Sequence, residues 1–87
     1  MVNEVKYFAI VRDGDSPEHP SGLARRTMTR QGRLDETLRR DLTWKRDSAI
    51  YEWERGEEMG TDLVEISSAQ AERLIRGFQQ EWSAEQG

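Results

Sequence analysis

The chain has 87 residues, no cysteine and a formal net charge of −4, from 13 basic and 17 acidic side chains. This length suits a single domain, residues 1–87. The lack of cysteine excludes a disulfide framework, a thiolate nucleophile and a cysteine-based zinc site. No basic region leads into an apolar run at the N-terminus, and no run approaches about 18 apolar residues, so we expect a cytoplasmic protein without a membrane span.

Charge is distributed unevenly along the sequence. Residues 22–46 hold eight basic and three acidic side chains, whereas residues 47–87 hold three basic and ten acidic ones. Such a split indicates either a nucleic-acid patch or complementarity between two halves of the domain or between two subunits. The negative net charge is opposite to the basic surface expected of a nucleic-acid-binding domain, so complementarity is the favoured interpretation.

The first predicted elements are a strand and a loop. Residues 5–12 are almost continuously apolar, which predicts either a strand buried on both faces or a central strand of a small sheet. Residues 13–22 contain two prolines, two glycines and three acidic residues. This composition is typical of a loop, and we expect the loop to be mobile.

A hairpin is predicted from residues 23–30 and 33–44, with a turn at Gln31-Gly32. The segment 34–44 is ambiguous between helix and strand. Its leucines recur every four residues, and two of its acidic residues precede arginines by four, as in a helix. The same leucines, Leu34, Leu38 and Leu42, share one parity with Trp44, as in a long strand. We favour the strand, because an arginine-rich hairpin beside residues 5–12 provides a sheet for a helix to cover.

Residues 47–82 predict two helices separated by a strand. Asp47 is expected to cap a short helix over 48–55 that ends at Gly56, and residues 62–66 predict a strand. Residues 67–82 give the clearest helix, with a capping box formed by Ser67 and Gln70. Its apolar face consists of Ala71, Leu74, Ile75, Phe78 and Trp82. Gly77 costs such a helix about 0.5–1 kcal/mol relative to alanine, so either another backbone passes close to it or the helix is weak there.

Together these elements predict an α+β domain. We expect a small, mostly antiparallel sheet of three or four strands, covered by the C-terminal amphipathic helix, with a short helix near residues 48–55.

Several short motifs also carry a family resemblance. They are Trp44, Asp-Ser-Ala-Ile-Tyr at 47–51, Glu-Arg-Gly at 54–56, and Leu-Val-Glu-Ile-Ser at 63–67 before the last helix. In this pattern the chain resembles small uncharacterised proteins of high-GC Gram-positive bacteria. The resemblance extends over nearly the whole chain, from residues 7–11 onward, and implies no catalytic residue and no ligand.

The sequence offers little support for catalysis. His19 is the only histidine and lies in the polar loop, where we expect it to be solvated. The acidic residues around it miss the calcium-loop spacing, since Pro17 takes a ligand position and Glu18 takes the place of the glycine. The other acidic runs are typical of a solvated face rather than of an acid–base pair. We therefore predict a non-enzymatic protein without a metal or cofactor.

Arginines and aromatic residues provide the clearest functional lead. The candidate basic patch is Arg25, Arg26, Arg30, Arg33, Arg39, Arg40 and Arg46, next to Lys45, and the candidate aromatic contacts are Trp44, Tyr51 and Trp53. On paired strands, several guanidinium groups would share one side and follow a phosphate backbone, with Trp44 stacking on a base. The acidic residues Asp35, Glu36 and Asp41 would instead neutralise the arginines locally.

The favoured functional hypothesis is a small interaction or regulatory module whose partner is another protein or a second copy of the chain. Its basis is the uneven charge without any catalytic constellation. Nucleic-acid binding through residues 23–46 is the alternative.

Overall fold

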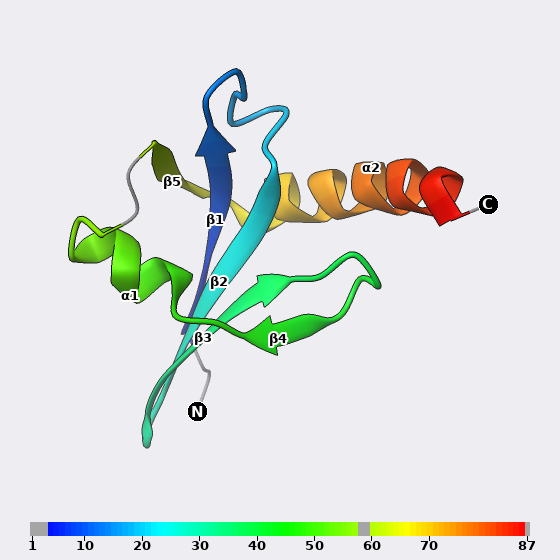
Figure 1. Cartoon of the computed structure of the whole chain (residues 1–87). Coiled ribbons are helices and arrows are strands. Elements are labelled where there is room, and N and C mark those ends of the chain that lie inside the picture. The colour runs from blue at the N-terminus through cyan, green and yellow to red at the C-terminus, as the bar shows by residue number, and fades with distance from the viewer. Residues whose placement is uncertain (1–3, 58–59, 87) are drawn as a thin grey trace.

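The computed structural model describes residues 4–57 and 60–86 (Figure 1). Its elements are β1 (Glu4–Arg12), β2 (Gly22–Thr29), β3 (Gly32–Leu38), β4 (Trp44–Arg46), α1 (Ala49–Glu54), β5 (Thr61–Ile66) and α2 (Ser68–Gln86). The five strands form one antiparallel sheet in the order β4-β3-β2-β1-β5. The predicted α+β class is confirmed, including the C-terminal helix, and the sheet has one strand more than the three or four expected.

The additional strand is β4. The segment 34–44, which was predicted to be one strand, is divided in the structure between β3 and a turn that leads into β4. β3 stops at Leu38, and the chain then reverses through a turn in which the Leu42 N–H donates to the Arg39 carbonyl at 2.8 Å. Leu42 adopts a φ of 65°, in the left-handed region. Trp44 comes to lie opposite Leu38 in an antiparallel pair. A single strand through residue 44 was therefore the wrong prediction, and a helix was wrong throughout.

The acidic residues of β3 explain why the strand is preferred to the helix. Asp35 and Glu36 form ion pairs with Arg26 and Arg25 across the β2–β3 ladder, at 2.8 and 2.9 Å. In a helix the same carboxylates would face arginines four residues later, at an exposed surface where each pair contributes about 0.3–0.5 kcal/mol. The cross-strand pairs are less exposed to solvent and form together with the backbone ladder.

Both faces of the sheet are covered, each by one helix (Figure 1). On one face, here called the α2 face, α2 packs against Ala9 and Leu23. On the other, the α1 face, Ile50 of α1 packs with Ala24 and Leu63. Side chains of β1 reach both clusters, because successive residues of a strand point to opposite sides. β1 lies between β2 and β5, so the expected interior strand of a small sheet is confirmed, although Ala9 is its only buried residue.

The helix ends follow the predicted signals. The Gln70 N–H donates to Ser67 Oγ at 3.1 Å, and the Ser67 N–H donates to Gln70 Oε1 at 2.9 Å, which is the expected capping box of α2. At the start of α1 the Ala49 N–H donates to Asp47 Oδ1 at 2.8 Å, so Asp47 supplies the capping carboxylate although Ser48 is the flanking residue. Gly56 has a φ of 76°, as expected of a helix-ending glycine.

The loop between β1 and β2 is organised around Asp15. Its carboxylate accepts hydrogen bonds from the Ser21 hydroxyl and, at 2.9 Å, from the Arg12 N–H. These two bonds hold the pKa of Asp15 below its usual range, the Ser21 bond having the larger effect. Pro20 is buried at the end of the loop. The expected mobility of residues 13–22 in solution stays a prediction.

Candidate binding surfaces

The predicted basic patch is divided between the two faces of the sheet. Arg25 and Arg26 are neighbours on β2 and therefore point to opposite sides. Arg25 lies on the α2 face, where its Nε is 2.9 Å from Glu36 Oε1 and its guanidinium carbon is 4.3 Å from the centre of the Trp44 ring. One side of the Trp44 ring, which was expected to stack on a base, is thus occupied by a side chain of the protein itself.

Arg26 has a structural role on the α1 face. Its Nε and one terminal nitrogen bind the two oxygens of Asp35 at 2.8 and 3.1 Å, and both terminal nitrogens also bind Glu54 of α1, at 2.8 and 3.0 Å. Only 12% of the Arg26 side chain and 12% of the Asp35 side chain are exposed. The hydrogen bonds to Asp35 and then to Glu54 raise the pKa of Arg26, and Arg26 in turn lowers the pKa of Glu54. Arg26 therefore ties β2, β3 and α1 together.

Other arginines of the patch each have a different neighbour. Arg39 forms an ion pair with Asp47 at 3.1 Å. The guanidinium carbon of Arg33 is 5.8 Å from the Tyr51 ring centre, and that of Arg40 is 5.1 Å from the Trp82 ring centre. Exposed positions at the β2–β3 turn and on β4 are occupied by Arg30 and Arg46. The structure thus brings the predicted patch together only in part, and acidic neighbours neutralise Arg25, Arg26 and Arg39.

The predicted aromatic contacts are also separated. Trp44 lies on the α2 face, whereas Trp53 packs into the cluster on the α1 face. Tyr51 is 43% exposed on α1, and its hydroxyl accepts a hydrogen bond from Arg55 at 2.8 Å. Tyr7, which the sequence did not single out, is the aromatic neighbour of Trp44, with 6.2 Å between the ring centres. Its position on β1 opposite Arg25 is set by strand register, which no short sequence motif indicates.

Part of the α2 face, beside the cluster that α2 covers, is partly accessible to solvent. We call this part the open face and define it as Val5, Tyr7, Arg25, Leu34 and Trp44. Val5 and Leu34 both pair with Thr27, so their side chains share one side of the sheet with Tyr7. Val5 is 40% exposed, and the other four are partly buried. Trp, Tyr and Arg are the residue types that contribute most of the binding energy in protein interfaces.

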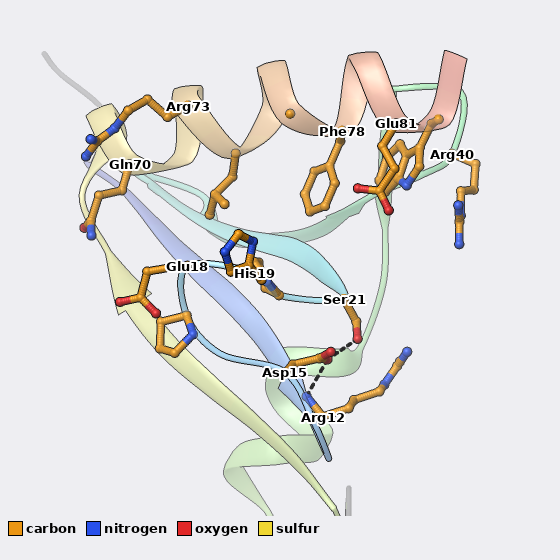
Figure 2. Close-up of a pocket in the computed structure, with 15 residues that line it drawn as sticks. Arg12, Asp15, Glu18, His19, Ser21, Arg40, Gln70, Arg73, Phe78 and Glu81 are labelled. Carbon is orange, nitrogen blue, oxygen red and sulfur yellow. Dashed lines mark hydrogen bonds between the residues drawn. The ribbon is translucent and has the colours of Figure 1, made fainter. Parts of the chain in front are cut away.

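A second candidate surface is the hollow between α2 and the 13–22 loop. The hollow is an open groove with a volume of about 820 Å³. Figure 2 shows Glu18 and His19 on its loop side and Arg73 and Phe78 on α2. Its charged lining residues are Arg12, Arg40 and Arg73 on one hand and Asp15, Glu18 and Glu81 on the other. Positive and negative groups are equal in number in this lining.

Gly77 faces the same groove. A methyl group on its Cα would meet no atom of the described residues within 4 Å. Close approach of another backbone therefore does not explain the glycine at position 77. The other explanation from the sequence, that α2 is less stable at this residue, remains.

Metal-ligand side chains do not converge in the described part of the chain. No three His, Asp or Glu side chains among residues 4–57 and 60–86 are placed to hold a metal ion. Within the same residues, no helix combines the length and apolar character required to cross a bilayer.

Comparison with known proteins adds no relative to this description. No family model, no curated protein and no solved structure matches the chain.

Proposed function

We propose that the chain is a non-enzymatic protein-interaction module that binds another protein or a second copy of itself through the open face. The observation that carries this proposal is the arrangement around Trp44. Its ring lies 6.2 Å from Tyr7 and 4.3 Å from the guanidinium carbon of Arg25, which Glu36 holds by an ion pair at 2.9 Å. Side chains fixed in this way lose little conformational entropy on binding, so more of the contact energy contributes to affinity.

The charges on this surface favour a protein over a nucleic acid as the partner. Arg25 is paired with Glu36, and Arg26 points to the opposite face, where it is paired with Asp35 and Glu54. Guanidinium groups engaged in this way release few counterions from a phosphate backbone, and counterion release supplies most of the affinity of nucleic-acid binding. Binding at the open face should accordingly depend on apolar contact and respond weakly to salt.

The displaced pKa values of three acidic residues fit a structural role for these groups. The carboxyl groups with a displaced pKa in the described residues, Asp15, Asp41 and Glu54, are all shifted downward, by hydrogen bonds to Ser21, Thr43 and Arg26 respectively. A general acid requires the opposite shift, a carboxyl kept protonated near neutral pH by desolvation. These three groups are better suited to holding loops and helices in place.

The test compares two variants that differ only in the face of the sheet that they alter. Val5→Glu places a carboxylate on the open face, and Met28→Glu places one on the α1 face at a side chain of similar exposure, 40% and 43% respectively. Self-association is measured by sedimentation velocity, and partner capture by affinity purification from a lysate of the native host. We expect the wild-type chain and Met28→Glu to form the same dimer or capture the same protein, and Val5→Glu to lose it by at least tenfold.

Two results would overturn the proposal. One is unchanged association of Val5→Glu, which would move the interface away from the open face. The other is a monomer that captures no protein but binds labelled DNA or RNA with an affinity that falls steeply between low and physiological salt, as phosphate contacts require.

A further inference from the structure

A second interaction surface lies at the β5 edge of the sheet, away from the open face. β5 pairs only with β1, so its outer side has no neighbouring strand in the described residues. The opposite edge is β4, which has three residues including the exposed Lys45, whereas β5 has six residues and contains neither lysine nor proline. Short length and lysine are common protections of an edge strand against pairing with another chain. β5 lacks both.

The hydrogen bonds of β1 show which groups of β5 point outward. The Ile10 carbonyl accepts from the Ser21 N–H at 2.9 Å, and the Arg12 backbone bonds with Asp15, so even-numbered residues of β1 direct their backbone toward β2 and the loop. Odd-numbered residues therefore face β5, where Ala9 and Val11 pair with Val64 and Asp62. Backbone groups alternate sides along a strand, so the N–H and C=O groups of Leu63 and Glu65 point away from the sheet.

The exposed side chains beside these groups are acidic. Asp62 pairs with Val11 and so projects on the α2 face, while Glu65 pairs with Phe8 and projects on the α1 face. Both are exposed, and they are three residues apart on opposite faces. A strand added to this edge would therefore meet one carboxylate on each side.

We propose that β5 accepts an extended basic segment of a partner protein as a sixth strand. The segment would make about four backbone hydrogen bonds with Leu63 and Glu65. Lys or Arg side chains three positions apart would lie next to Asp62 and Glu65, one on each face of the sheet. A second copy of β5 is disfavoured in this place, because it would bring two more carboxylates into the same short ladder. This inference is independent of the open face.

Amide hydrogen exchange with a synthetic peptide tests the proposal directly. In the free protein we expect fast exchange at Leu63 and Glu65 and slow exchange at Val64, whose N–H is bonded to β1. A Thr-Lys-Val-Thr-Lys-Val peptide should slow exchange at Leu63 and Glu65 at least tenfold, whereas Thr-Glu-Val-Thr-Glu-Val should not.

Variants separate the backbone contribution from that of charge. Glu65→Pro removes the outward N–H and should abolish binding of the lysine peptide, while Glu65→Gln keeps the N–H and should weaken binding about threefold to tenfold. The double variant Asp62→Lys/Glu65→Lys should reverse the preference, so that the glutamate peptide binds and the lysine peptide does not. This variant keeps every backbone N–H of β5, so it also tests the proposal if Glu65→Pro does not fold.

Unchanged amide exchange at Leu63 and Glu65 with either peptide at millimolar concentration would overturn the proposal. Equal slowing by both peptides, or slowing by protein concentration alone, would overturn the choice of a basic partner.

Discussion

Replacing Arg26 with alanine should be the most destabilising single change among the charged residues of the sheet. Arg26 and Asp35 are each only 12% exposed and share two hydrogen bonds of 2.8 and 3.1 Å. Arg26→Ala leaves the Asp35 carboxylate in place without its partner, and an uncompensated buried charge costs about 3–5 kcal/mol. Because some solvent reaches Asp35, we expect a loss of about 2–4 kcal/mol here.

This loss is large for a domain of 87 residues. Stabilities of about 0.05–0.15 kcal/mol per residue give a total of roughly 4–13 kcal/mol. A loss of about 2–4 kcal/mol should lower the melting temperature by about 10–30 °C. The measurement is urea unfolding followed by the fluorescence of the three tryptophans, with the unfolding midpoint compared at constant denaturant slope.

Two further variants make the reasoning refutable. Glu54→Ala removes the other partner of Arg26. Because the Glu54 side chain is 43% exposed, its loss should cost no more than about 1 kcal/mol. Arg26→Met/Asp35→Leu removes both buried charges and should recover most of the loss, because apolar groups of similar volume often replace a buried pair without penalty. If Arg26→Ala cost no more than Glu54→Ala, or if the double variant were as unstable as the single one, the charge argument would fail.

Three other predictions concern α2 and the response to acid. Gly77→Ala should raise the free energy of unfolding by about 0.5–1 kcal/mol, since the added methyl group has free space; a lower thermal midpoint would contradict this. Ser67→Ala should cost about 1 kcal/mol by removing one bond of the capping box, and an unchanged urea midpoint would show that the cap contributes nothing. Folding lowers the pKa values of Asp15 and Glu54. Both carboxylates therefore stabilise the fold at pH values above their unfolded pKa values near 4. This stabilisation is lost as the pH falls through the folded pKa values. Unfolding midpoints should therefore decline below about pH 4.5, and less steeply in Glu54→Gln; a flat profile would refute the assignment.

The parts of the fold that could be predicted from the sequence have local causes. The capping box of α2 and its apolar face involve residues within a few positions of each other, as does the left-handed Gly56 that follows α1. Each of these signals acts through backbone geometry that is independent of the rest of the chain.

The end of β3 illustrates why other parts could not be predicted. Asp35 and Glu36 are spaced for ion pairs with later arginines in a helix and equally for pairs with β2 across a hairpin, so the sequence pattern fits both. The outcome depends on the presence of β2, a tertiary effect. Leu42 takes a left-handed conformation that its residue type does not favour, and the turn that creates β4 was therefore missed.

The open face was missed for a related reason. Trp44 was a candidate because of its type, but its neighbours come from three other strands. Tyr7 and Arg25 face each other in the β1–β2 ladder, and Glu36 lies beside Arg25 on β3. Strand register places these residues together, and register is fixed by the whole sheet rather than by any short segment.

The paired arginines of β2 also have a consequence for the order in which the protein folds. Arg25 and Arg26 stand directly opposite Glu36 and Asp35, so a slip of one residue in either direction would leave only one of the two arginines opposite a carboxylate. The β2–β3 hairpin therefore has its own means of selecting the right alignment, and hairpins form within about 1–10 μs. The β1–β5 ladder must instead join segments from the two ends of the chain, which carries a larger loop-closure cost. We expect the hairpin to be an early template, and the addition of β5, the strand with the free edge, to complete the sheet last.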